Sequence, residues 1–306
     1  MLGLKNVAVI GAGGNLGPFV TEKLAEAGFH TTIIIRPESK YTLPDSHAHL
    51  TNHLLRVKRC AFDEESLTAA FHGQDVVVVM IGKGVAILSQ KTIIDAAARA
   101  GVKRFFPSEF GSNTLSAELL RNVPAMKAKA MILTYLQQKA AAHPALKWTA
   151  ICNGAFFDWG LTSGFLGFNL QEQTANIYGS GNQHFHATMR STIGLAIVSA
   201  LRNPDTENKY LYISNISTSQ RELLSVLEMN SGSPWKVTSK DVMVERAEGM
   251  DKLARQDFSG MGQLILADLY GEGKGTVDPV ELDNELLGLE AVGLERLVSR
   301  TMQCSI

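Results

Sequence analysis

The chain has 306 residues, of which 45% are hydrophobic and 19% are charged, a composition typical of a globular protein rather than a disordered or fibrous one. Its 29 basic and 30 acidic side chains leave a formal charge of -1, which argues against nucleic acid or an anionic membrane as partner and favours a small molecule. Glycines interrupt the apolar N-terminal stretch, and the longest later apolar run, residues 76–81, is far shorter than the roughly 20 residues that span a bilayer. Cys60, Cys152 and Cys304 are widely separated, so we expect reduced thiols and a cytoplasmic protein.

Strand-like and helix-like periodicities alternate through the first half of the chain. A β-branched run at 7–10 leads into glycines, and apolar residues then recur at helical spacing as far as Gly28. The continuous VVVVMI run at 76–81 predicts a strand buried on both faces, as in a parallel sheet covered by helices. The repeated units predict an α/β fold with a doubly wound parallel sheet, the Rossmann arrangement. Further strands are expected at 31–35, 55–61, 75–81, 102–108 and 147–154, and further helices at 65–71, 89–100 and about 127–142.

The turn after the first strand is rich in glycine. Only glycine lets a backbone approach a pyrophosphate closely, and the start of the following helix offers N–H donors at the positive end of the helix dipole. Because the cluster follows the first strand and opens a helix, it predicts a dinucleotide site, with a tight structural turn as the alternative. The residues expected to contact the dinucleotide in this turn are Gly11, Gly13, Gly14, Asn15, Leu16 and Gly17.

The end of the second strand indicates which dinucleotide binds. NAD enzymes of this fold place an Asp or Glu there for the ribose hydroxyls, but no carboxylate lies between Glu26 and Glu38. The strand ends instead in Arg36, which can form paired hydrogen bonds with a 2'-phosphate, with Lys40 as a second cation. This pattern favours NADPH over NADH, although Arg36 could also be a solvated charge at a strand end. Gly82, which follows the fourth strand, completes the cofactor-binding residues expected in this half.

The alternation of strands and helices fades after residue 155. We expect residues 1–155 to form an NADP-binding Rossmann domain, with a return segment near 184–215, and residues 156–306 to form a smaller C-terminal substrate-binding domain. The second part opens with an aromatic cluster, which predicts either a pocket for a flat apolar substrate or the packing face of the smaller domain. The aromatic residues expected to bind substrate are Phe156, Phe157 and Trp159, together with Phe110 of the first part.

The helix expected at about 127–142 contains two candidate arrangements for catalysis. Tyr135 and Lys139 have the Tyr-x-x-x-Lys spacing of many nicotinamide-dependent reductases, but they lie near the end of the helix. Ligands of a doubly wound sheet bind at the carboxyl edge of the strands, beside the beginnings of helices, so we interpret this match as accidental. Lys127 lies in the first turns and is the better placed group, although Lys129 is two residues away and many helical lysines only face water.

Four blocks are spread across nearly the whole chain: VAVIGAGGNLG at 7–17, RFFPSEFG at 104–111, KAKA at 127–130 and ELLGLEAVGLERLV at 285–298. Together they resemble the isoflavone reductase-like and NmrA-like group of atypical short-chain reductases. The most specific of them contains FFPSEFG. One departure is visible, because Ser191 and Thr192 stand where relatives usually have an acidic residue, which affects the segment between the two expected domains.

The resemblance implies roles for two segments. In the plant reductases of this group, the lysine that opens the helix after the FFPSEFG loop is the proposed general acid or base, and it corresponds to Lys127. Val123 stands where the partner tyrosine would be, so Lys127 would act without one. The resemblance also implies that the loop formed by Ser108, Glu109 and Phe110 contacts the nicotinamide end of the cofactor, beside Lys127. A loop shaped only by its proline and glycine is the alternative.

Three functional hypotheses follow. In the first, the protein is an NADPH-dependent reductase that transfers hydride to a conjugated carbon of a small aromatic or polyketide-like metabolite, with Lys127 as general acid or base. In the second, it is an NmrA-like regulator that senses the dinucleotide without turnover. In the third, it is a non-redox member that retains NADP as a structural ligand. The oligomeric state is open, with a homodimer as one option.

Two other chemistries are not expected. Five of the eight histidines form two groups with a spacing that could suit a metal. Neither group has a nearby cysteine or paired carboxylate, which argues against a metal site because zinc needs three converging ligands. No Gly-x-Ser-x-Gly segment is present, so a serine hydrolase is not indicated either. The histidines concerned are His47, His49 and His53 in one group, and His184 and His186 in the other.

Overall fold

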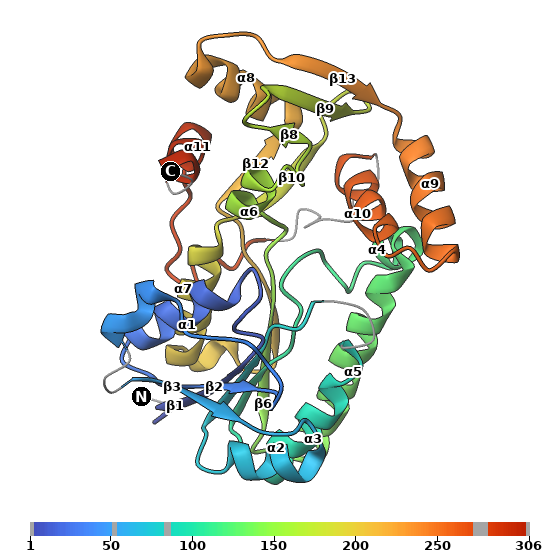
Figure 1. The fold of residues 1–306 in the computed structure, drawn as a ribbon. Coiled ribbons are helices and arrows are strands. Elements are labelled where there is room, and N and C mark those ends of the chain that lie inside the picture. The colour runs from blue at the N-terminus through green and yellow to red at the C-terminus, as the bar shows by residue number, and fades with distance from the viewer. Residues whose placement is uncertain (1–2, 51–53, 83–86, 272–280, 304–306) are drawn as a thin grey trace.

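The computed structural model describes residues 3–50, 54–82, 87–271 and 281–303. Its main sheet has seven strands in the order β11-β6-β5-β4-β1-β2-β3, and every neighbouring pair is parallel (Figure 1). Strands β2 and β3 follow one another on one side of β1, and strands β4, β5 and β6 follow one another on its other side. This order confirms the predicted doubly wound sheet. The strands are β1 (Asn6–Ile10), β2 (His30–Ile35), β3 (Leu55–Arg59), β4 (Val76–Val79), β5 (Arg104–Phe106), β6 (Lys147–Cys152) and β11 (Lys209–Tyr212).

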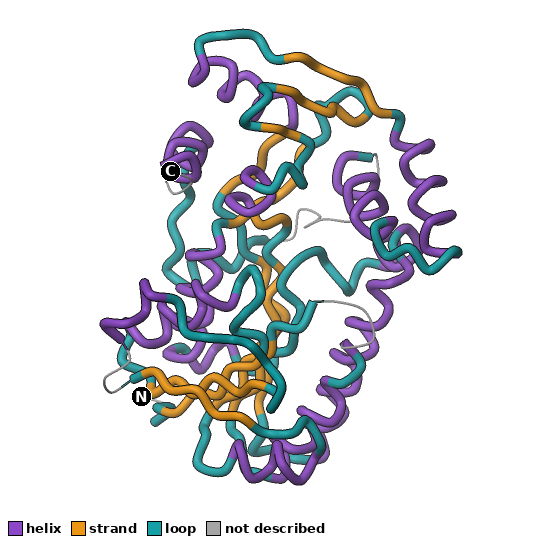
Figure 2. The backbone as a smooth tube through the Cα atoms, in the orientation of Figure 1, coloured by secondary structure: helices purple, strands orange, loops and turns teal. Residues whose placement is uncertain are grey.

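Helices cover both faces of the main sheet, as the purple segments around the orange strands of Figure 2 show. One face carries α1 (Gly17–Glu26) and α7 (Arg190–Arg202). The other carries α2 (Glu64–Phe71), α3 (Gln90–Arg99) and α5 (Lys127–Ala142). Helix α7 and strand β11 come from the second half of the chain, and they return to the main sheet beside α1 and β6 respectively.

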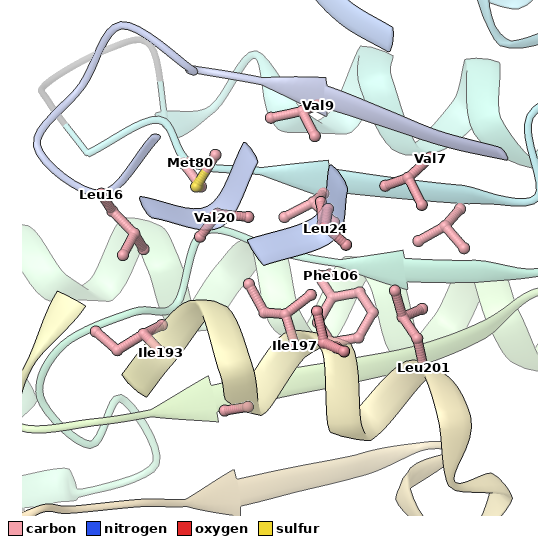
Figure 3. Close-up of a cluster of buried hydrophobic side chains, with 14 of the residues drawn as sticks. Val7, Val9, Leu16, Val20, Leu24, Met80, Phe106, Ile193, Ile197 and Leu201 are labelled. Carbon is pink, nitrogen blue, oxygen red and sulfur yellow. The ribbon is translucent and has the colours of Figure 1, made fainter. Parts of the chain in front are cut away.

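Strand β4 is buried on both faces, as its sequence predicts. Side chains of a strand point alternately to opposite sides, so its four valines divide between two cores. Val76 and Val78 pack under α1 and α7, in the cluster that Figure 3 shows together with Ile197 of α7. Val77 and Val79 pack under α2, α3 and α5. Strand β4 therefore lies between two helical layers.

The remaining elements build a smaller part with its own core. Two three-stranded sheets have the orders β12-β10-β7 and β13-β9-β8. Aromatic side chains such as Phe157 and Tyr270 fill the space between these sheets and the adjoining helices. No helix among the described residues has both the length and the apolar character needed to cross a bilayer. The elements of this part are β7 (Ala155–Phe156), α6 (Phe157–Thr162), β8 (Phe168–Asn169), β9 (Thr174–Tyr178), β10 (His184–Thr188), β12 (Ile216–Ser219), α8 (Gln220–Ser231), β13 (Lys236–Lys240), α9 (Val242–Ala254), α10 (Gly260–Tyr270) and α11 (Leu294–Gln303), and α4 (Ala117–Asn122) lies before α5.

Candidate active site

The glycine turn between β1 and α1 packs its backbone directly against neighbouring backbone. Gly11 has a positive φ of 91°, and a Cβ there would collide with the carbonyl group of Met80. A Cβ at Gly17 would collide with the main chain of Ala12. The residue at the N-cap of α1, Leu16, provides no side-chain hydrogen bond to the helix. At the start of α1, the backbone N–H groups are therefore the donors available to bind an anion.

Cations gather where β2 ends. Arg36 and Lys40 are both exposed, and the main chain between them is held by Arg59 at the end of β3. The Arg59 Nη1 donates hydrogen bonds to the carbonyl oxygens of Pro37 and Ser39, both at 2.8 Å. Sequence reasoning missed Arg59, although the predicted parallel pairing of the second and third strands could have placed it beside Arg36.

Tyr41 covers the glycine turn. A Cβ added at Gly13 would lie 3.1 Å from Cδ2 of the Tyr41 ring, so the segment after β2 folds back onto the turn. The Tyr41 hydroxyl is buried and has no hydrogen-bond partner among the described residues. Burial raises the pKa of Tyr41, so the hydroxyl remains a neutral donor. An unpartnered hydroxyl beside a turn that only glycine fits is consistent with a dinucleotide at this position.

The loop after β5 is held by side chains from distant parts of the chain. The Ser108 N–H donates to Oε1 of Gln90 in α3 at 2.9 Å. The carboxylate of Glu109 accepts a hydrogen bond from the hydroxyl of Thr114, and at 3.3 Å one from the hydroxyl of Tyr210 in β11. Tertiary contacts therefore order this loop together with a local hydrogen bond from the Glu109 N–H to the Pro107 oxygen, at 2.8 Å.

Glu109 and Lys129 form a buried acid–base pair behind this loop. The Lys129 Nζ donates to the main-chain oxygen of Glu109 at 2.9 Å, and the two residues are only 8% and 1% exposed. Burial raises the pKa of Glu109, and the charge of Lys129 opposes this effect. Burial likewise lowers the pKa of Lys129, opposed by Glu109. Each group offsets the cost of burying the other.

Lys127 faces a different side of α5. Two residues along a helix differ by about 200° in direction, so Lys127 and Lys129 cannot share one environment. Lys127 is exposed and lines an open hollow of about 570 Å³ together with Lys91, Leu120 and Met131. The structure thus separates the two lysines, and the one that contacts the β5 loop is Lys129. Its position on the apolar stripe of α5 is the signal that could have shown this.

Tyr135 and Lys139 both contact Asp95 of the neighbouring helix α3. The Tyr135 hydroxyl donates to both carboxylate oxygens of Asp95 in α3, at 2.7 and 2.8 Å. The Lys139 Nζ lies 2.6 Å from Oδ1 of the same carboxylate. These contacts join the later turns of α5 to α3.

The four aromatic residues expected to bind substrate have different environments. Phe110 is buried in the core between the main sheet and helices α1 and α7, whereas Phe156 is partly exposed beside that core. Phe157 has no exposed surface and packs in the core of the smaller part. Trp159 is partly exposed, with its ring centre 5.1 Å from that of Phe165. Phe156 and Trp159 are thus the members that present surface to a ligand.

Sequence-based expectations also concern the histidines, the cysteines and Gly82. No group of three potential metal ligands converges among the described residues, and His53 and the side chain of His49 lie outside them. Cys60 and Cys152 are free thiols, while Cys304 also lies outside the described residues. Burial raises the pKa of Cys152 to about 12, so this thiol is not a nucleophile. Gly82 is exposed after β4.

Residues 4–265 match the model of a family described as the NmrA-like family. The chain belongs to this family. The NmrA-like chain is similar over its whole length to the oxidoreductase aprR of Aspergillus flavus, at 35% identity covering 97% of this chain and 98% of that protein. It is 31% identical to the oxidoreductase poxI of Penicillium oxalicum, covering 95% and 92% of the two chains. An isoflavone reductase homolog of Solanum tuberosum is 31% identical, covering 76% of each.

Solved structures show the same fold as this NmrA-like protein. The complex of leucoanthocyanidin reductase with NADPH from Vitis vinifera superposes with a TM-score of 0.80 at 19% identity, covering 97% of this chain and 99% of that one. The structure titled AtPrR2 with NADP+ and (+)pinoresinol has the same TM-score and coverage at 22% identity. The predicted resemblance to isoflavone reductase-like and NmrA-like proteins is confirmed.

Proposed function

We propose that this NmrA-like protein is an NADPH-dependent reductase of a small aromatic or polyketide-like metabolite, acting on a conjugated carbon. The observation that carries the proposal is the glycine turn, in which Gly11 and Gly17 admit no side chain, with Arg36 at the end of the adjacent strand. The names of the fungal relatives, both oxidoreductases, and the NADPH and NADP+ complexes of the structural neighbours support it.

The residues of the turn and of the strand ends fit the cofactor. The backbone of the glycine turn would hold the pyrophosphate, with Asn15 and Leu16 at the start of α1. Arg36 and Lys40 would hold the 2'-phosphate, because a guanidinium pairs with phosphate through two hydrogen bonds. Gly82 and the β5 loop would face the nicotinamide, as the family resemblance implies. When bound, NADPH supplies the hydride.

The proton that the reaction needs would be donated or accepted by a lysine in the first turn of α5. Lys127 would hold a proton at Nζ for the substrate atom that becomes negative, and its place at the beginning of α5 supports this role. Lys129 is the alternative, because its Nζ contacts the Glu109 carbonyl in the loop assigned to the nicotinamide end. Phe156 and Trp159 present the partly exposed rings that a flat substrate could contact.

Nucleotide binding tests the cofactor part of the proposal. NADPH and NADH are titrated into wild type and Arg36→Ala, with Arg121→Ala in the exposed last turn of α4 as the control. We expect wild type and the control to prefer NADPH, and Arg36→Ala to lose about tenfold or more of that preference, as one charge-assisted pairing is removed. Equal affinities in wild type would favour the dinucleotide-sensing alternative.

Single-turnover absorbance tests the reaction. NADPH-loaded wild type, Lys127→Ala and Lys91→Ala are mixed with a panel of enone and quinone-methide-type aromatics. Lys91 lines the same hollow as Lys127 and serves as the control. We expect Lys127→Ala to slow NADPH oxidation by about 100-fold or more, as for a lost general acid. If NADPH binds with preference but no compound is reduced, a non-redox member is the better description, and normal turnover by Lys127→Ala would remove this lysine from the mechanism.

A further inference from the structure

Arg190, the first residue of α7, contacts both halves of the proposed site. Its Nη1 donates to the main-chain oxygen of Asn15 in the glycine turn at 3.0 Å. Its Nε donates to Oδ2 of Asp158 in α6, also at 3.0 Å. The guanidinium lies 4.3 Å from the centre of the Phe19 ring in α1. Arg190 thus joins the start of α1, the start of α7 and helix α6.

The ion pair between Arg190 and Asp158 is shielded from water. Their side chains are 18% and 10% exposed, so solvent screens this pair less than a surface pair. The Asp158 carboxylate also accepts a hydrogen bond from the Arg190 main-chain N–H at 3.3 Å, which ties α6 to the N-terminus of α7. A lysine could not make the same set of contacts, because only a guanidinium has several donors in a fixed plane.

The two groups that Arg190 connects have different expected ligands. Asn15 belongs to the turn assigned to the dinucleotide, and Asp158 stands between Phe157 and Trp159 in the aromatic segment. Helices α1 and α7 pack closely, because a Cβ at Gly194 would lie 2.8 Å from the Phe19 carbonyl oxygen. The two helices are therefore in direct contact, and Arg190 connects α6 to both of them.

We propose that Arg190 is a positioning residue that transmits occupation of the glycine turn to α6 and its aromatic side chains. The inference rests on the proposed NADPH site. A pyrophosphate at the start of α1 brings negative charge close to the Arg190 guanidinium, and this charge restricts the arginine between Asn15 and Asp158. Restricting Arg190 in turn restricts α6, so the cofactor orders the segment that faces the substrate before the substrate arrives.

Hydrogen exchange with and without saturating NADPH tests the inference, with residues 155–163 as the reporter. Arg190→Met removes the contacts, and Asp158→Asn weakens them from the other end while keeping a side chain of the same size. Arg202→Met is the matched control, because Arg202 joins the far ends of the same two helices by donating to the Ala27 carbonyl at 3.0 Å. The NADPH dissociation constant is measured for every variant so that all are compared at saturation.

In wild type and Arg202→Met, NADPH should slow exchange of residues 155–163. In Arg190→Met the slowing should be lost, with the dissociation constant raised by about tenfold, and Asp158→Asn should lose part of it. Should Arg190→Met not fold, loss of the slowing in Asp158→Asn alone carries the test. Slowing that persists in both variants overturns the inference, and so does a wild type that binds NADPH without any slowing at 155–163. A wild type that does not bind NADPH contradicts the proposed function itself.

Discussion

The carboxyl edge of the main sheet contains two loops that are stabilised in opposite ways. The turn after β1 is formed by neighbouring residues, with hydrogen bonds from the N–H of Gly14 to the Gly11 oxygen and from the N–H of Gly17 to the Gly14 oxygen. The loop after β5 depends on residues far away in the sequence, among them Lys129 and Tyr210. The half assigned to the phosphates is thus a local backbone structure, whereas the half assigned to the nicotinamide is a product of tertiary packing.

The two loops also differ in how they treat charge. The glycine turn has no ionisable side chain of its own, and its closeness to other backbone leaves room only for hydrogen atoms at Gly11 and Gly17. The β5 loop encloses a carboxyl group and an ammonium group that are both removed from water. Substitutions should therefore act on the first loop through shape and on the second through charge. The following substitutions test this difference.

Lys129→Met should have the largest effect on stability. It keeps the length of the side chain but removes the hydrogen bond to the Glu109 carbonyl oxygen and the positive charge that opposes the burial of the Glu109 carboxylate, which we expect to lower the free energy of unfolding by about 3 kcal/mol. Urea unfolding measures this loss. Because Lys127 is exposed, Lys127→Met should change stability by less than about 0.5 kcal/mol. Adding Glu109→Gln to Lys129→Met should recover part of the loss. Equal effects of the two lysine variants would show that the buried pair is not the feature that stabilises this loop.

Gly17→Ala should have the next largest effect. Its Cβ would collide with the main chain of Ala12, and relief of this collision should cost about 2 kcal/mol and weaken NADPH binding. Gly13→Ala is the matched control in the same turn, because its Cβ approaches only the Tyr41 ring, which can move. Thermal unfolding and NADPH titration of both variants give the comparison. If both alanines have the same effect, shape at Gly17 is not what defines the turn.

The smallest of the expected effects is the change that Glu109→Gln makes in the pH dependence of stability. Burial raises the pKa of Glu109 above its ordinary value of about 4.3, so the folded protein holds this proton more tightly than the unfolded chain does. Glu109 therefore makes stability decline as the pH rises from about 4.3 through the folded-state pKa. Glutamine cannot ionise, so the stability of the variant relative to wild type should increase over this range. Urea unfolding at several pH values measures the difference, and a difference that falls with pH contradicts the raised pKa.

Local sequence signals were sufficient to predict the fold and to locate the glycine turn after the first strand. The apolar run of β4 predicted a strand buried on both faces, and its valines do divide between two cores. The glycine turn could be recognised because its glycines cluster between the first strand and the first helix. The steric requirement at Gly17 comes from the nearby Ala12, whereas that at Gly11 comes from Met80, far away in the sequence. An apolar run and a glycine cluster are each only a few residues long, so the sequence pattern alone is enough to locate them.

Only the tertiary structure decided the environment of the individual charged groups. Lys127 and Lys129 are nearly equivalent in sequence, yet packing of α5 buries one of them against Glu109 and leaves the other in an open hollow. Arg190 has no motif at all, since its partners Asn15 and Asp158 come close only when α7 packs beside α1. Burial and charge pairing depend on the whole fold, because desolvation is set by every atom around a group and not by its neighbours in the chain.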